Sequence, residues 1–320
     1  MSPHTRPILL PNLRLLCVAA VLALSNLEPA RAATAGAGYT ETKYPVVLIH
    51  GFLGFDNIAV VDYFYGVPKA LREGGATVYT PGLSQVATNV ERGEQLLAKL
   101  RQLKAAYGYQ KFNLIGHSQG GTTARYVAEV APELVASVTT VGTPHTGTKF
   151  ADFVTTAISL PVLGPLAQGL INGLGTLIAV LSGSPSNPQD AATAVTAVNT
   201  PGALAFNKRF PKGAPTSVCG SGPAAVDGIT YRSAGGTGVV TNPLDISDSL
   251  MLLASLTLVG EANDGIVGRC STHWGEVIRD DYFWNHLDEI NQAFGLRSWL
   301  SPDPVAFYRS QTNWLKLSGR

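Results

Sequence analysis

The stretch FNLIGHSQGGTTARYV, residues 112–127, decides the fold because three patterns follow one another in it. An apolar run ends at His117, a Gly-x-Ser-x-Gly pattern surrounds Ser118, and a helix-like segment begins directly afterwards. A serine between a buried strand and a helix N-terminus is typical of a nucleophile elbow. The pattern predicts Ser118 as a nucleophile. The alternative is a serine that only caps a helix in a glycine-rich turn.

The chain around this stretch alternates between two kinds of segment. Apolar runs rich in β-branched residues predict strands at 44–50, 76–80, 111–117 and 135–144. Helix-like spacing predicts helices at 61–75, 89–108 and 119–134. Such alternation predicts an α/β fold with a mostly parallel central sheet and helices on both faces. No linker or repeat divides the chain, so we expect one domain over 33–320.

A serine nucleophile needs a histidine base and a carboxylate that orients it, and in this fold the chain order is serine, acid, histidine. Histidines 50, 117 and 145 lie before the serine or too close to it, which leaves His273 and His286. The acid candidates are Asp245, Asp248, Glu261 and Asp264. Asp264 lies in a polar turn after an apolar run, where a strand-end acid is expected. Order and spacing favour Asp264 with His286, and His273 stays open as the alternative base.

The segment VVLIHGFLGFD, residues 46–56, is a second glycine-rich strand end. A His-Gly-x turn after a central strand commonly supplies one backbone N–H of an oxyanion hole. Phe52 would supply that N–H, and Gln119, directly after the serine, would supply the second. The alternative is a plain turn at the end of the strand.

Residues 151–183 interrupt the alternation with an almost uncharged segment that contains Pro and Gly. Composition alone fits a pair of buried helices equally well as a mobile lid whose apolar face covers a site and then docks on lipid.

The N-terminus has the pattern of a secretory signal peptide, residues 1–32. Arg6 and Arg14 precede an apolar run at 15–24, and ARA at 30–32 offers a cleavage site. The run is shorter than the ~20 residues that span a bilayer, which argues against a membrane anchor. The formal net charge of the chain is +1, which gives no electrostatic basis for binding nucleic acid.

Removal of this leader would take Cys17 and leave Cys219 and Cys270. Two cysteines in an exported protein suggest one disulfide. The alternative is a pair of free buried thiols.

Six segments together resemble the secreted true lipases of bacterial lipase family I, of Pseudomonas and Burkholderia type. They are YPVVLIHGFLGFDN, RGEQLL, NLIGHSQGG, ASVTTVGTPHTG, ANDGIVGRC and NHLDEINQAFGL, which begin between residues 44 and 285. The resemblance implies an α/β-hydrolase fold that hydrolyses long-chain triacylglycerols. The alternative that shares every site residue is a carboxylesterase for short, soluble esters.

The resemblance also implies a role for each site residue. Ser118 is the nucleophile, Asp264 the acid and His286 the base; Phe52 and Gln119 supply the oxyanion donors, although relatives often carry Leu or Met at the first of these positions. The lid falls at roughly 158–183, and the disulfide joins Cys219 to Cys270. A structural calcium ion would be bound by carboxylates of Asp245 and Asp288 and by backbone carbonyls of Gln292 and Leu296. A membrane-bound foldase and type II export are further expected, and the enzyme would act as a monomer.

Overall fold

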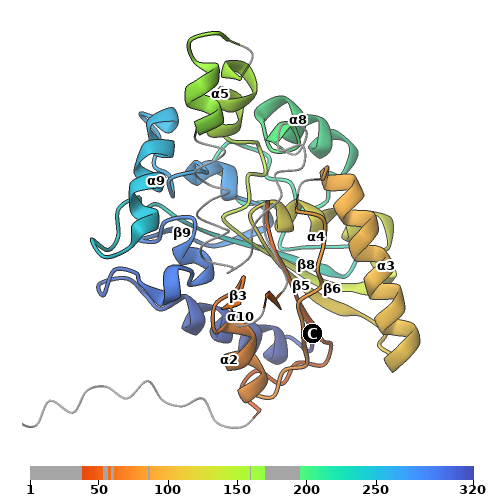
Figure 1. The fold of residues 1–320 in the computed structure, drawn as a ribbon. Helices are drawn as coiled ribbons and strands as arrows, with labels where there is room; N and C mark the ends of the chain where they lie inside the picture. Colours follow the sequence, from red (N-terminus) through yellow and green to blue (C-terminus); the bar gives the residue numbers. More distant parts are fainter. Residues whose placement is uncertain (1–37, 53–56, 59–60, 86, 159, 170–194) are drawn as a thin grey trace, which may run out of the picture. The chain divides into compact units, whose positions relative to one another are not determined.

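The computed structural model describes residues 38–52, 57–58, 61–85, 87–158, 160–169 and 195–320. Residues Ala37–Arg320 form one compact unit (Figure 1). The predicted signal peptide lies outside the described residues, and so do residues 159 and 170–183 of the predicted lid. Among the described residues, no helix combines the length and the apolar character needed to cross a bilayer.

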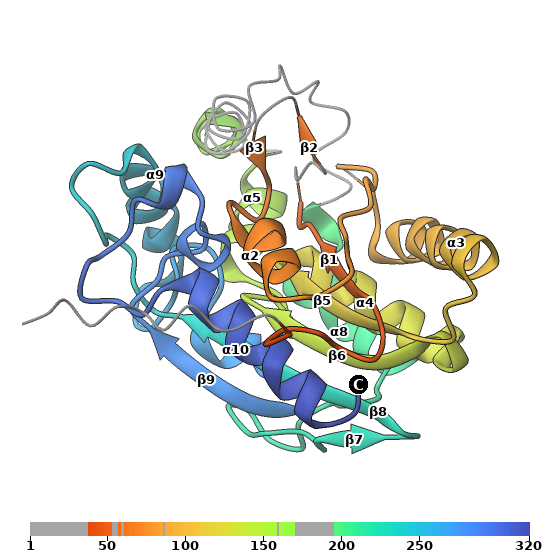
Figure 2. The ribbon, with the colours of Figure 1, turned by 90° about the horizontal axis from the view of Figure 1, so that it is seen from below.

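The centre of this unit is a seven-stranded sheet in the order β4-β1-β5-β6-β8, with β7 and β9 both pairing with β8 (Figure 2). The strands are β1 Val46–Ile49, β4 Val78–Tyr79, β5 Phe112–His117, β6 Val135–Val141, β7 Ala225–Val226, β8 Ile229–Gly236 and β9 Glu276–Tyr282. All pairs are parallel except β7 with β8. Because parallel strands end at one edge, the turns after β1, β5 and β6 meet there.

Alternate side chains of the sheet pack into two separate hydrophobic cores, one on each face. In β1, Val46 and Leu48 face one core, and Val47 and Ile49 face the other. The first core is covered by α2 Val67–Glu73, α5 Lys149–Ala157, α9 Ile246–Ser255 and α10 Pro304–Leu317. The second is covered by α3 Asn89–Tyr107, α4 Gln119–Val130 and α8 Thr200–Arg209, and Figure 1 shows α3 and α4 on the opposite side of the sheet from α2 and α10. The sheet therefore has helices on both faces, as predicted.

The remaining described elements are short. A two-stranded sheet pairs β2 Asn57–Ile58 with β3 Val61–Asp62. Single 3-10 turns occur at Pro132–Leu134, Leu256–Leu258, Arg269–Thr272, Asp288–Ile290 and Ala293–Gly295.

Two local predictions were wrong. The helix expected at 61–75 begins only at Val67, because β3 occupies Val61–Asp62 and Gly66 adopts a left-handed conformation with φ 72° before the helix starts. The apolar run before Asp264 is not a strand: it forms α9 and the 3-10 turn Leu256–Leu258. The polar turn with Asp264 therefore follows helical structure, and the strand on that side of the sheet is β9.

A disulfide joins Cys219 and Cys270, which are 51 residues apart in the sequence. It ties the loop before β7 to the 3-10 turn Arg269–Thr272, so the expected pairing is present in the structure.

Candidate active site

Ser118 occupies the turn between β5 and α4. It is a non-glycine residue with φ 53° and ψ −130°, a strained conformation that persists only where the surroundings enforce it. Its backbone N–H donates to the carbonyl of Val141, 2.9 Å away, which ties the turn to β6. A side chain at Gly116 would collide with the Gly120 backbone, so the tight turn requires glycine there. These contacts hold the serine on the turn that the sequence predicted.

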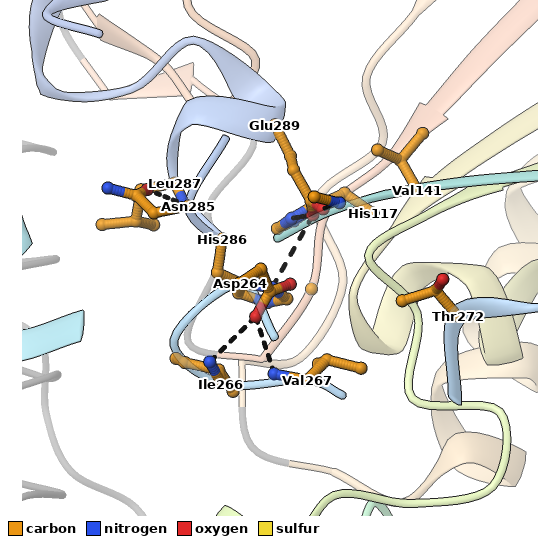
Figure 3. Close-up of polar contacts among 12 residues, drawn as sticks. His117, Val141, Asp264, Ile266, Val267, Thr272, Asn285, His286, Leu287 and Glu289 are labelled. Carbon is orange, nitrogen blue, oxygen red and sulfur yellow. Dashed lines mark hydrogen bonds and ion pairs between the residues drawn. The ribbon is translucent and has the colours of Figure 1, made fainter. Parts of the chain in front are cut away.

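His286 and Asp264 lie close together, as Figure 3 shows, and His286 lines the same cavity as Ser118. Nδ1 of His286 lies 2.7 Å from Oδ2 of Asp264. The other carboxylate oxygen of Asp264 accepts two backbone N–H bonds, from Ile266 at 2.8 Å and Val267 at 2.7 Å. Because an ionised carboxylate is only an acceptor, Nδ1 carries the hydrogen and Nε2 of His286 is left as the basic nitrogen.

Ser118 and His286 line the same cavity, which measures about 850 Å³ when its open mouth is included. Most of the other side chains that line it are apolar: Phe52, Pro144, Phe150, Ala151, Val195, Val198, Ile266, Val267, Leu287 and Ile290. A mainly apolar cavity with few polar groups is the usual form of a binding site for an apolar ligand. The nucleophile and base candidates therefore face one space that an acyl chain could fill.

The alternative base His273 belongs to a different environment. Its Nε2 lies 2.8 Å from Asp280 Oδ2, and its Nδ1 lies 3.1 Å from the Gly220 carbonyl. Both ring nitrogens of His273 thus lie against acceptor atoms other than the Ser118 hydroxyl. The three other acid candidates are also engaged elsewhere: Asp245 caps α9, Asp248 accepts bonds from Thr241 and Asn242, and Glu261 pairs with Lys149. Of the four acids, Asp264 is the one hydrogen-bonded to His286.

The two expected oxyanion donors flank the serine. Gln119 is the first residue of α4, where backbone N–H groups have no partner within the helix. Its side chain points elsewhere and donates to the Ala87 carbonyl at 2.9 Å. Phe52 lies two residues beyond His50 and lines the cavity with Ser118. The structure thus places Gln119 at the turn and Phe52 at the same cavity, and their role as oxyanion donors stays a prediction.

Sequence reasoning missed a second polar network that borders the base. Glu289 is fully buried, and its Oε2 lies 3.2 Å from His117 Nε2 and 3.7 Å from His286 Nδ1. The ring centroids of His117 and His286 are 4.6 Å apart. Burial, and then the charge of Asp264, raise the pKa of Glu289 well above its ordinary value, whereas burial lowers the pKa of His117. The spacing of Glu289, three residues after His286, was the available signal, since such residues share one face of a helical turn.

The four residues expected to bind calcium lie around the loop that follows His286. Asp245 Oδ2 and Asp288 Oδ1 are buried atoms without a hydrogen-bond partner. Burial, together with the charges of Asp245 and Asp248, raises the pKa of Asp288 to about 7. Gln292 and Leu296 lie in the same loop. Unpartnered carboxylate oxygens are suited to a hard divalent cation, so this donor set fits calcium.

Several non-glycine residues in this loop have a left-handed backbone conformation. Asn291, Ala293 and Phe294 all have left-handed φ values, of 58°, 52° and 59°. Three such non-glycine residues close together need strong external constraints. A bound cation that holds the loop carbonyls would supply such a constraint.

Fold and site together define an α/β hydrolase, and a family model described as "alpha/beta hydrolase fold" matches residues 44–212. The chain is 50% identical over 283 residues to a triacylglycerol lipase of Vibrio cholerae, covering 88% of this chain and 90% of that one. It is 42% identical over 326 residues to a triacylglycerol lipase of Burkholderia plantarii, covering 90% of each chain. A third triacylglycerol lipase, of Pseudomonas fragi, is 42% identical over 291 residues, with 87% and 98% coverage. The chain belongs to the family of these bacterial triacylglycerol lipases.

Solved structures with low sequence identity share the fold. The Staphylococcus hyicus lipase superposes with a TM-score of 0.58 at 18% identity, covering 87% of this chain and 97% of that one. The mature form of the Bacillus licheniformis lipase BlEst2 gives 0.57 at 19% identity, with 86% and 93% coverage.

Proposed function

We propose that this protein is a secreted lipase that hydrolyses long-chain triacylglycerols through an acyl-enzyme on Ser118. The observation that carries the proposal is that Ser118, held in a strained turn, lines the same apolar cavity as His286, which is hydrogen-bonded to Asp264. The sequence identity to triacylglycerol lipases supports the substrate class.

In the first half of the reaction, Oγ of Ser118 attacks the ester carbonyl carbon while Nε2 of His286 takes the hydroxyl proton. The carbonyl oxygen becomes an anion, which the N–H groups of Phe52 and Gln119 stabilise. The carbonyl then re-forms, the bond to the glycerol oxygen breaks, and His286 gives its proton to that oxygen. Asp264 stabilises the imidazolium while it exists. Each oxyanion donor contributes about 3–4 kcal/mol to the lowering of the barrier.

In the second half, a water molecule replaces the alcohol. His286 takes a proton from this water, whose oxygen attacks the acyl carbon. The bond to Ser118 Oγ breaks as the serine recovers its proton from His286, and the fatty acid leaves. The apolar cavity holds the acyl chain throughout, which favours a long, apolar substrate over a short, soluble one.

We propose that residues 158–183 form a lid over this cavity. In the described part, residues 164–169 are helical, and the apolar side chains of Leu160, Val162, Leu163 and Leu166 are exposed, Val162 by 84%. Several exposed apolar side chains within one short segment suit contact with a lipid surface. The test is the hydrolysis rate of one ester, measured below and above its solubility limit. A jump in rate above the limit supports a lid. A smooth curve, together with a preference for short esters, supports a carboxylesterase for soluble esters.

We further propose one structural calcium ion at Asp245 and Asp288, with carbonyls of Gln292 and Leu296 as additional ligands. The unpartnered carboxylate oxygens support it. When bound, the cation neutralises the two buried carboxylates. Three of these ligands lie in the loop that follows His286. A bound cation would hold this loop and thereby the position of the base.

For export, we propose cleavage of a signal peptide near residue 32, help from a membrane-bound foldase, and a monomeric extracellular enzyme. N-terminal sequencing of secreted protein tests the cleavage. Secretion with and without a co-expressed foldase tests the chaperone, and sedimentation of the purified enzyme tests the monomer.

The activity itself is tested by release of fatty acid from emulsified triolein. Ser118→Ala should abolish it, whereas Ser310→Ala, which removes an exposed hydroxyl from α10, should leave it unchanged. Substantial triolein hydrolysis by Ser118→Ala would end the proposed mechanism.

A further inference from the structure

The hydroxyl of Tyr63 lies between the turn that carries Phe52 and the end of β5. No step of the proposed reaction uses this hydroxyl. Tyr63 is 7% exposed and lines the cavity. Its Oη accepts the backbone N–H of Gly51 at 3.1 Å and lies 2.8 Å from Nδ1 of His117. One phenol therefore connects the residue before Phe52 with the residue before Ser118.

The N–H of Gly51 belongs to the His50–Gly51 peptide, and the other polar group of that peptide is also held. The carbonyl of His50 accepts a hydrogen bond from the guanidinium of Arg92, which is fully buried. A peptide unit is planar, so hydrogen bonds on its carbonyl and its N–H fix its rotation. Tyr63 and Arg92 thus hold this one peptide at both ends.

The next peptide carries the N–H of Phe52. Its carbonyl, that of Gly51, lies 3.0 Å from Nδ1 of His50 and accepts its hydrogen. The bond is trans, so the Phe52 N–H points opposite to that carbonyl and away from the buried imidazole of His50. Its exact direction depends on the Gly51 dihedral angles, and Gly51 has no side chain to restrain them. The hydrogen bond from the Gly51 N–H to Tyr63 adds a second restraint to the one that His50 places on the Gly51 carbonyl.

The same hydroxyl reaches the side of the site that holds the base. Nε2 of His117 lies 3.2 Å from Glu289, whose other oxygen accepts the Gly236 N–H at 2.7 Å. One ring nitrogen of His117, one ring nitrogen of His286 and one carboxylate oxygen of Glu289 all lie within 4.8 Å of one another. A chain of hydrogen bonds therefore runs from the Gly51 peptide to the surroundings of His286.

We propose that Tyr63 is a positioning residue that orients the Phe52 N–H toward the oxyanion by holding the Gly51 peptide. This inference rests on the proposed function and deepens it. Oxyanion donors act because they are aligned before the reaction, and a displacement of about 1 Å can cost on the order of 10²-fold in rate. Loss of one restraint on the donor, rather than of the donor, should cost less.

The test is Tyr63→Phe, which removes the hydroxyl and keeps the ring. We expect kcat for p-nitrophenyl butyrate, counted per active site titrated with a phosphonate, to fall about tenfold with KM unchanged. A trifluoromethyl ketone, to which Ser118 adds to form an oxyanion, should bind more weakly by the same factor. Hydrogen exchange at the Gly51 amide should accelerate. Tyr65→Phe, which removes a hydroxyl from the same segment, should change none of these.

Counting active sites removes any loss that comes from unfolded protein. A kcat equal to that of wild type, or a reduced kcat with unchanged ketone affinity, would overturn the role of Tyr63. Unchanged exchange at Gly51 would overturn it as well, since a direct contact of the phenol with substrate would leave that amide alone. Failure of the proposed function would look different, because Ser118→Ala would then stay active.

Discussion

Nδ1 of His286 lies 2.7 Å from Oδ2 of Asp264, although 22 residues separate them in the sequence. The backbone N–H of His286 also donates to the Asp264 carbonyl at 2.8 Å. The pair is therefore joined through main chain and side chain, and both residues are at most 5% exposed. Such double attachment fixes the imidazole plane with Nε2 as its free basic nitrogen.

Asp264→Asn should lower kcat by about 10³–10⁴-fold and leave KM nearly unchanged. The amide oxygen of the new Asn can still accept the N–H bonds of Ile266 and Val267, which turns its NH₂ group toward His286. Nδ1 must then accept, Nε2 carries the hydrogen, and the base is lost. The assay is triolein hydrolysis at saturating substrate.

The matched control is Asp280→Asn, because Asp280 is partly buried and forms a second His–Asp pair in the described structure, with His273. It should keep activity. Loss of activity in Asp280→Asn, with activity kept in Asp264→Asn, would show that His273 is the base.

Acid should destabilise the protein through buried neutral histidines. Burial, with help from Arg92, lowers the pKa of His50 to about 3, and burial lowers the pKa of His145 well below its usual value. The unfolded chain binds protons below about pH 6.5 and the folded chain does not, so stability falls as pH falls. Each histidine contributes about 1.4 kcal/mol per pH unit in that window.

Unfolding by urea at pH 7, 6 and 5 measures this effect for wild type and His145→Gln. His145 Nδ1 accepts from Arg125 and its Nε2 donates to Thr140, so the substitution should destabilise the fold at pH 7. The difference from wild type should shrink toward pH 5. A difference that stays constant over this range contradicts the assignment.

Chelation of calcium should lower the melting temperature by about 5 °C and reduce activity in parallel. A cation at 100 times its dissociation constant adds about 2.7 kcal/mol, which corresponds to a shift of this order. Asp288→Asn should lose most of the response to the chelator, because it removes a buried carboxylate oxygen with no other partner. Asp281→Asn, an exposed carboxylate on β9, should keep it. An unchanged melting temperature in wild type would rule the site out.

Removal of the disulfide should destabilise the fold by about 4 kcal/mol, the chain-entropy value for a loop of 51 residues. The measurement is the free energy of unfolding of Cys219→Ser/Cys270→Ser against wild type. Reductant should lower the stability of wild type and leave the double variant unaffected. Equal stability of the two proteins would mean that the bond contributes nothing.

Features that depend on neighbouring residues could be predicted from the sequence, and features that depend on distant contacts could not. The elbow at Ser118 was predictable because strand, turn and helix are contiguous and each leaves its own pattern. The strands of the first half could be read for the same reason, since buried parallel strands are continuous apolar runs. The strand β9 was missed because it is partly exposed beside β8. Its sequence, EVIRDDY, therefore contains charged residues and is not a continuous apolar run.

Features that depend on distant contacts were not visible. His117 meets Glu289 across 172 residues and Tyr63 across 54, and neither contact leaves a pattern at its own position. The choice between His273 and His286 was open on spacing, and the structure separates them by their partners. Likewise, the two unpartnered carboxylate oxygens of Asp245 and Asp288 become apparent only once burial is known.

Labelling with a p-nitrophenyl alkylphosphonate, followed by peptide mapping by mass spectrometry, tests the central claim most directly. We predict one phosphonyl group per molecule, attached to Ser118, with activity lost in proportion to labelling. A label on another residue, or full activity of protein labelled at Ser118, would contradict the account.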